Sequence, residues 1–206
     1  MYHIVLASES PRRKEILEQM GIPYTSMPAN VKENAMDCEP SDMVKALARL
    51  KARDVAERIQ TCSKDLIIIG ADTLVFHNGK ALGKPKDRQD AIEMLKSLSD
   101  DCHEVYTGVC IIIRRYKQEH IDIITDEEIA FSVSTQVQVQ PLTMEQIEDY
   151  VDSGEPLDKA GAYAIQGEFG IYIKEIHGDY YNVVGFPIAQ IHQKLLAKGI
   201  NIKKLK

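Results

Sequence analysis

The sequence predicts an α/β fold built on a mixed central sheet. The apolar runs Ile4–Ala7 and Leu66–Ile69 alternate with helical segments, which is typical of buried strands in α/β proteins. Val105–Arg115 and Ile121–Val139 are long strand candidates that flank a polar loop. This spacing favours a hairpin over a crossover helix, so antiparallel strands are expected beside parallel ones.

Start and stop signals delimit the other elements. Ser10 and Pro11 predict the first turn of a helix that Gly21 closes. Asn78-Gly79 predicts a tight hairpin turn. Further helices are expected at 41–58 (opened by a serine), 88–98, 143–153 (with a capping box) and 187–198, and a further strand at 171–176.

Bulk properties indicate one soluble domain over residues 1–206. The chain is 44% hydrophobic, which is enough for one sizeable core, and it shows no repeat or linker. Its net charge of -6 disfavours nucleic acid as a partner, since phosphate contacts need clustered cations. No apolar run is long enough to span a membrane, no signal peptide is expected, and the four cysteines form no CxxC pair. We therefore expect a cytoplasmic protein with reduced thiols.

The first helix start is a candidate anion site. Ser8, Ser10, Arg12 and Arg13 surround a strand-to-helix turn. A helix N-terminus has unpaired N–H groups and a positive dipole end, and arginine adds planar donors that suit phosphate oxygens. A plain capped helix with solvated arginines explains this motif equally well.

Lys51 is out of place on its helix. It lies in the middle of the apolar face formed by Val44, Leu47, Ala48 and Val55. A buried lysine requires a carboxylate or an anionic ligand, unless its stem is buried and its amine reaches water. The sequence leaves both interpretations open.

Asp72 is the leading catalytic candidate. It follows the strand Leu66–Ile69, and open α/β sheets hold ligands at the carboxyl ends of their strands. A carboxylate there would bind a divalent metal or take a proton from water, whereas a turn aspartate would only accept backbone hydrogen bonds. Lys84 adds a cation from the loop that follows the hairpin.

Two other segments contribute candidates. Residues 153–167 are dense in small residues, fit neither a regular helix nor a strand, and carry Gln166, whose amide is suited to reading a base edge. Glu33 lies in a loop and would be an ordinary solvated acid on its own. No P-loop, Rossmann fingerprint, HExxH or GxSxG motif is present.

These pieces together resemble the Maf family of nucleotide pyrophosphatases, from Ile4 to about Leu196. The matching segments are Leu6–Arg13, Gly70–Thr73, Gly83–Pro85, His103–Val109, Gly154–Gly161, Ile165–Gly167 and Gly178–Pro187. The resemblance implies an elongated, two-lobed fold similar to that of inosine triphosphate pyrophosphatases, with the site in a cleft. It also implies cleavage between the α and β phosphates and, from the family alone, a homodimer.

The resemblance assigns roles to particular residues. Catalytic positions are Glu33, Lys51, Asp72 and Lys84, of which Asp72 and Glu33 would hold Mg²⁺ or Mn²⁺. Substrate-binding positions are Ser8, Arg12, Arg13, Thr73 and Gln166. Arg12, Thr73 and Gln166 match the branch that acts on dTTP and UTP. The same chemistry on 7-methyl-GTP, CTP or a modified pyrimidine, and a catalytically silent regulator of cell division that binds nucleotide, are the alternatives.

Overall fold

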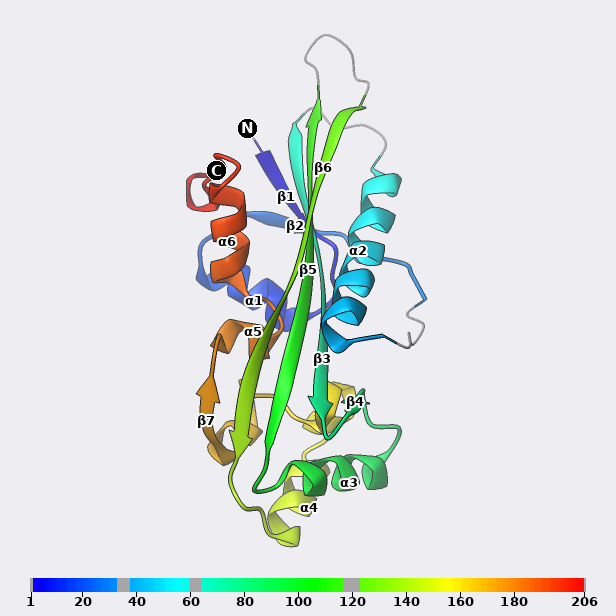
Figure 1. Cartoon of the computed structure of the whole chain (residues 1–206), viewed down its shortest axis with the longest axis vertical. Coiled ribbons are helices and arrows are strands. Elements are labelled where there is room, and N and C mark those ends of the chain that lie inside the picture. Colours follow the sequence, from blue (N-terminus) through cyan, green and yellow to red (C-terminus); the bar gives the residue numbers. More distant parts are fainter. Residues whose placement is uncertain (1, 33–37, 60–63, 117–122, 206) are drawn as a thin grey trace.

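The computed structural model describes residues 2–32, 38–59, 64–116 and 123–205, and shows an elongated molecule built around one twisted sheet (Figure 1). In chain order its elements are β1 (Tyr2–Leu6), α1 (Pro11–Gln19), β2 (Tyr24–Ser26), α2 (Pro40–Arg58), β3 (Asp65–His77), β4 (Lys80–Leu82), α3 (Arg88–Leu98), β5 (Cys102–Tyr116), β6 (Ile123–Val139), α4 (Met144–Asp152), β7 (Ile173–His177), α5 (Tyr180–Val184) and α6 (Ile188–Leu196). Four short 3-10 helices complete them: η1 (Glu155–Asp158), η2 (Ala160–Ala162), η3 (Glu168–Tyr172) and η4 (Ile202–Lys204).

The described sheet is mixed, as the sequence predicts. Its strand order is β2-β1-β3-β5-β6-β7, and β4 pairs with β3. β1 runs parallel to β2 and β3, whereas β3, β5, β6 and β7 pair antiparallel in succession. The expected α/β class with a mixed sheet and an elongated shape is therefore confirmed.

Helix α2 lies against one face of the sheet (Figure 1), and its backbone comes close to two strands. Two glycines permit this approach: a Cβ atom at Gly70 would lie 2.4 Å from the Ala48 carbonyl oxygen, and one at Gly108 would lie 2.2 Å from that of Val44. Only a residue without a side chain fits beneath the helix at these points. Gly70 and Gly108 thus set the height of α2 above the sheet.

Three apolar clusters stabilise the described structure. One joins α2 to its face of the sheet, and a second joins α1 and α6 to the opposite face. The third packs α3 and α4 around Phe169 and Tyr163 at the other end of the long strands. Asp72 and Thr73 lie on β3 between Ala71, which belongs to the cluster of α1 and α6, and Val75, which belongs to the third cluster.

The structure corrects the environment predicted for Asp72. β3 does not end at Ile69 but continues to His77, so Asp72 and Thr73 lie within the strand. The strand persists because Leu66 to Phe76 pair without interruption with β5. The turn comes only at Asn78-Gly79, where both residues have positive φ, as the hairpin signal predicts.

Other boundaries differ by small amounts. α2 begins at Pro40 with Glu39 as N-cap, not at Ser41, because proline fits the first helical position well. Ser10 is the N-cap of α1, but its side chain makes no capping hydrogen bond. The expected strand 171–176 begins only at Ile173, and a short helix, α5, precedes the last helix. Helix 88–98 and the capping box of Thr143 with Gln146 are confirmed.

Candidate active site

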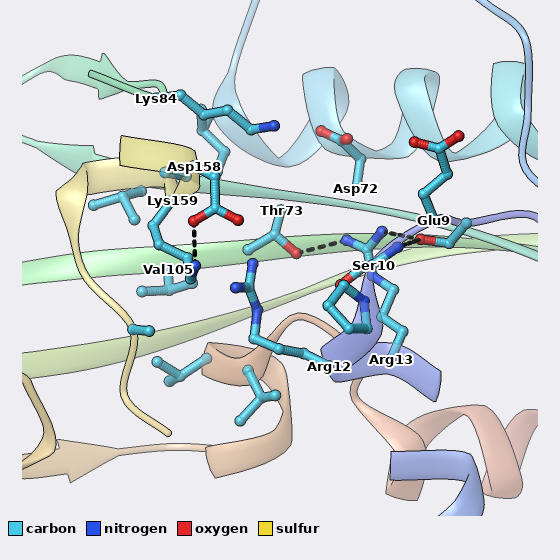
Figure 2. Close-up of a pocket in the computed structure, with 18 of the residues that line it drawn as sticks. Glu9, Ser10, Arg12, Arg13, Asp72, Thr73, Lys84, Val105, Asp158 and Lys159 are labelled. Atoms are coloured by element: carbon cyan, nitrogen blue, oxygen red, sulfur yellow. Dashed lines mark hydrogen bonds and ion pairs between the residues drawn. The ribbon is translucent and has the colours of Figure 1, made fainter. Parts of the chain in front are cut away.

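A cavity of about 860 Å³ opens beside the middle of β3. Its walls come from the β1–α1 turn, α2, β3, the loop after β4, the 3-10 segment and α5 (Figure 2). The predicted residues that line it are Ser8, Arg12, Arg13, Lys51, Asp72, Thr73, Lys84 and Gln166. Glu33, the remaining predicted residue, lies outside the described part of the chain.

The β1–α1 turn is fixed by Arg13, which is only 8% exposed. Its Nη1 donates to Ser8 Oγ at 2.9 Å, its Nη2 to Thr73 Oγ1 at 3.1 Å and its Nε to the Gly185 carbonyl oxygen at 2.8 Å. Ser8 Oγ also accepts from the backbone N–H of Ser10 at 3.2 Å. One guanidinium therefore joins the start of α1 to β3 and to the end of α5.

Lys51 and Asp72 form an ion pair in the wall of the cavity. Lys51 Nζ lies 2.5 Å from Asp72 Oδ1, and the two side chains are 14% and 13% exposed. A lysine on the apolar face of a helix is stabilised by such a carboxylate partner. The sequence left pairing and solvent exposure of Lys51 as alternatives, and the structure shows pairing.

Further charges lie across the cavity from α1. Lys84 and Asp72 point toward the same part of it, and Asp158 and Lys159 lie beside Lys84 (Figure 2). Lys159 Nζ donates to Asp158, and this hydrogen bond lowers the pKa of the Asp158 carboxyl, to which the charge of Arg12 also contributes. The proximity of these cations creates a region suited to a polyanion.

Part of the cavity wall is apolar. Val75, Val105, Tyr163, Ile165 and Val183 line it, and all five belong to the third apolar cluster or pack against it. A flat, uncharged group would lie against these side chains without burying unpaired charge. The cavity therefore offers both charged and apolar side chains, and a nucleotide needs both.

Tyr150 supports the loop that carries Gln166. Its hydroxyl donates to Glu155 Oε2 at 2.8 Å and accepts from the backbone N–H of Ala164 at 3.2 Å. A Cβ atom at Gly167 would lie 1.8 Å from Glu155 Oε1, so a larger residue after Gln166 would displace the carboxylate that Tyr150 holds. Local packing thus presents Gln166, which is itself exposed, at the edge of the cavity.

His103 is a structural residue. It is 2% exposed, its Nε2 lies 2.7 Å from the Tyr163 hydroxyl, and burial lowers its pKa from 6.5 to about 4. The ring is therefore neutral near pH 7. His103 is not among the residues that line the cavity, so we assign it a structural role and not that of a general base.

Other residues of the cavity wall were not assigned a role from the sequence. They are Glu9, Asp158, Lys159 and Tyr163. Asp158, Lys159 and Tyr163 lie in the small-residue segment 153–167, so the unusual composition was their signal. Glu9 had no signal, because a glutamate at a helix start is ordinary.

A divalent cation fits the chemistry of this wall. Mg²⁺ in nucleotide sites is bound by one or two carboxylates together with substrate phosphates, so a full protein cage is not required. Asp72 presents such a carboxylate at the cavity surface. Among the described residues there is no group of three or more His, Cys, Asp or Glu side chains able to hold a metal by themselves.

Comparison with known proteins identifies close relatives over the whole chain. A protein described as "dTTP/UTP pyrophosphatase" from Lachnoclostridium phytofermentans is 47% identical over 204 residues, covering 99% of each chain. Proteins with the same description from Agathobacter rectalis and Bacillus anthracis are each 44% identical. These matches cover 98% of this chain and 100% and 98% of the relatives.

A solved structure offers a weaker comparison. A nucleoside-triphosphatase, or dITP/XTP pyrophosphatase, from Mycobacterium abscessus matches 69% of this chain and 76% of its own, with 14% identity and a TM-score of 0.37. A likeness of this strength adds nothing to the description of the sheet given above.

The family assignment comes from the sequence profile. The profile described as "Maf-like protein" matches residues 3–198, which include the β1–α1 turn, the whole of β3 and α5. Together with the relatives, this match shows that the chain belongs to the Maf family.

Proposed function

We propose that this protein is a nucleoside triphosphate pyrophosphatase that hydrolyses dTTP and UTP to the nucleoside monophosphate and pyrophosphate. The observation that carries the proposal is the lining of the cavity, which combines several cations and the half-buried Asp72 carboxylate with a set of apolar side chains. The relatives described as dTTP/UTP pyrophosphatases support the choice of substrate.

The charged side chains of the cavity would hold the triphosphate. Ser8 and the N-terminus of α1 supply donors, and Arg12, Lys51 and Lys84 supply positive charge. Charge develops on pyrophosphate as it leaves, so cations fixed there stabilise the transition state more than the ground state. Arg13 would add its positive charge from the same turn. Its hydrogen bonds to Ser8, Thr73 and Gly185 fix the position of this charge.

The apolar side chains of the cavity would hold the base. Val75, Val105 and Tyr163 supply the walls, and Thr73 and Gln166 supply polar atoms near them. An amide both donates and accepts, which suits the carbonyl and N–H edge of uracil or thymine. This assigns pyrimidine recognition to Thr73 and Gln166 and leaves Arg12 to the phosphates.

Asp72 is the proposed proton acceptor. The water oxygen forms a bond to the α-phosphorus, the bond from that phosphorus to the bridging oxygen breaks, and the water proton passes to Asp72. Lys51 holds the carboxylate in place through the contact of 2.5 Å. A free aspartate has a pKa of about 4 and is a weak base at neutral pH.

We propose that Asp72 and Glu33 hold Mg²⁺ or Mn²⁺. Such a cation supplies charge neutralisation and a more acidic water when bound. Asp72 meets the requirement for a carboxylate at the cavity surface. The role of Glu33 rests on the family resemblance alone.

We propose that the enzyme is located in the cytoplasm, where the nucleotide pool lies. We also propose that it forms a homodimer. Cys38, Cys102 and Cys110 are free thiols, which fits a reducing compartment. Among the described residues, no helix has both the length and the apolar character needed to cross a membrane. The dimer rests on family resemblance, and its mass in solution tests it.

The test is pyrophosphate release from a panel of nucleotides with Mg²⁺, Mn²⁺ or EDTA. The panel contains dTTP, UTP, CTP, GTP, 7-methyl-GTP and 5-methyl-UTP. We expect turnover of dTTP and UTP that EDTA abolishes. Binding without turnover of any nucleotide would favour the regulatory alternative, and preference for 7-methyl-GTP would overturn the pyrimidine assignment.

A further inference from the structure

Behind Arg13, a line of hydrogen bonds leads away from the cavity into the sheet. Arg13 Nη2 lies 3.1 Å from Thr73 Oγ1, which lies 3.0 Å from Thr107 Oγ1. Thr107 Oγ1 in turn lies 2.9 Å from the carbonyl oxygen of Asn182. Thr73 and Thr107 are directly opposite each other on β3 and β5.

The chemistry of these groups sets the direction of every hydrogen bond. The Asn182 carbonyl can only accept, so Thr107 donates its single hydroxyl proton there. Thr107 can then only accept from Thr73, which leaves the Thr73 oxygen to accept from Arg13. Each hydroxyl thus donates once and accepts once, an arrangement in which neighbouring hydrogen bonds polarise each other.

The far end of the line is firmly held. Asn182 is fully buried, and its Nδ2 donates to the Val105 carbonyl oxygen at 2.9 Å and to Thr135 Oγ1 at 2.8 Å. The end of the same helix returns to the guanidinium, because the Gly185 carbonyl oxygen accepts from Arg13 Nε. A Cβ atom at Gly185 would lie 2.9 Å from Thr73 Oγ1, so glycine is needed for this approach.

We propose that Thr107 is a positioning residue for the active site, acting through Thr73 on the orientation of the Arg13 guanidinium. The proposal rests on the proposed function, because it concerns how the same turn meets the triphosphate. Thr107 is fully buried and is not among the residues that line the cavity. Its effect on substrate therefore passes through Thr73 and Arg13.

Two substitutions at this position separate the hydroxyl from the shape of the side chain. Thr107→Val keeps the volume but removes both the donor to Asn182 and the acceptor for Thr73. Thr107→Ser keeps the hydroxyl and loses only a methyl group. Ile111→Val is the matched control, because Ile111 is also fully buried, lies four residues along β5 and packs in an apolar cluster.

The first readout is the ¹⁵N–¹H signal of Arg13 Nε, assigned by its loss in Arg13→Lys. We expect Thr107→Val to shift or broaden this signal, and Thr107→Ser and Ile111→Val to leave it in place. This measurement needs no turnover. An unchanged signal in Thr107→Val would overturn the proposal whether or not the protein is an enzyme.

The second readout is kinetic, with UTP as substrate. We expect Thr107→Val to raise KM about fivefold to tenfold, with a smaller change in kcat. A change of this size corresponds to the net contribution of one hydrogen bond. Thr107→Ser should restore KM, while Ile111→Val should lower the melting temperature without changing KM. A Thr107→Val enzyme with lower stability and unchanged KM would show a purely structural role. A wild-type protein with no activity would instead refute the proposed function.

Discussion

Lys51 Nζ and Asp72 Oδ1 lie 2.5 Å apart, and their side chains are 14% and 13% exposed. The two charges come from different elements, helix α2 and strand β3, so the pair forms only when both are in place. An ion pair with so little solvent contact is costly to break from one side, because the remaining charge loses this contact while it stays largely out of water. Substitutions of these two residues can therefore be tested by their effects on turnover and on the free energy of unfolding.

Asp72→Asn should lower turnover of UTP by about 100-fold or more, because an amide cannot accept the water proton. The folded state should persist, since the amide has nearly the same shape. Steady-state kinetics and circular dichroism check this. Asp152→Asn is the control, because Asp152 pairs with Arg88 on an exposed surface, and its turnover should stay near that of the wild type. Wild-type turnover in Asp72→Asn would falsify the assignment.

Lys51→Met should weaken nucleotide binding and cost about 1–3 kcal/mol of unfolding free energy, because Asp72 loses its cation. Urea denaturation measures the loss. In the double variant Lys51→Met/Asp72→Asn, stability should partly recover, since both charges of the pair are then removed. A loss in the double variant equal to the sum of the two single losses would mean that the ion pair contributes nothing to folding.

His103 should make stability depend on pH between about 4 and 6.5. Burial lowers its pKa from 6.5 to about 4, so the unfolded chain binds a proton in this range and the folded chain does not. The contribution of the neutral ring is complete above pH 6.5 and is lost as the pH falls through 4, with a total on the order of 3 kcal/mol. His103→Gln should flatten the fall in melting temperature over this range. The same steep fall in the variant would assign it to other groups.

Gly108→Ala should prevent stable folding or cost about 3–5 kcal/mol, because the new methyl group would meet the backbone of α2. The added Cβ would lie 2.2 Å from both the carbon and the oxygen of the Val44 carbonyl. Gly83→Ala is the control, since a Cβ there meets nothing within 4 Å and should leave the melting temperature unchanged. Thermal denaturation of the two variants checks the contrast. Equal melting temperatures would mean that α2 tolerates a greater height above the sheet.

The sequence predicted the fold class, the helix at 88–98 and the hairpin at Asn78 because each rests on local signals. The extent of β3 could not be predicted in the same way. Gly70-Ala-Asp-Thr has the composition of a turn, and only pairing with β5 keeps it extended. Long-range pairing overrides local preference in such cases.

Site residues could be predicted where a residue did not fit the pattern of its own helix or strand. Lys51 on an apolar helix face indicated a buried partner, although its identity required the structure. Glu9 and the support of Gln166 by Tyr150 broke no rule and gave no signal. The connection from Arg13 to Thr107 was also hidden, because it joins residues far apart in the chain through hydroxyl groups that fit any strand.

The long strands have a consequence for how the protein meets its ligand. β5 and β6 pair from Cys102 with Gln138 to Tyr116 with Ile123, and so run from one end of the described sheet past the cavity to the other. Proteins that close on a ligand by hinge bending have a few flexible connections between their halves. Here β5 and β6 pair continuously from Cys102 to Arg115, so the described part of these strands contains no flexible connection of that kind. Changes that admit a ligand would therefore come from the side chains and loops that surround the cavity.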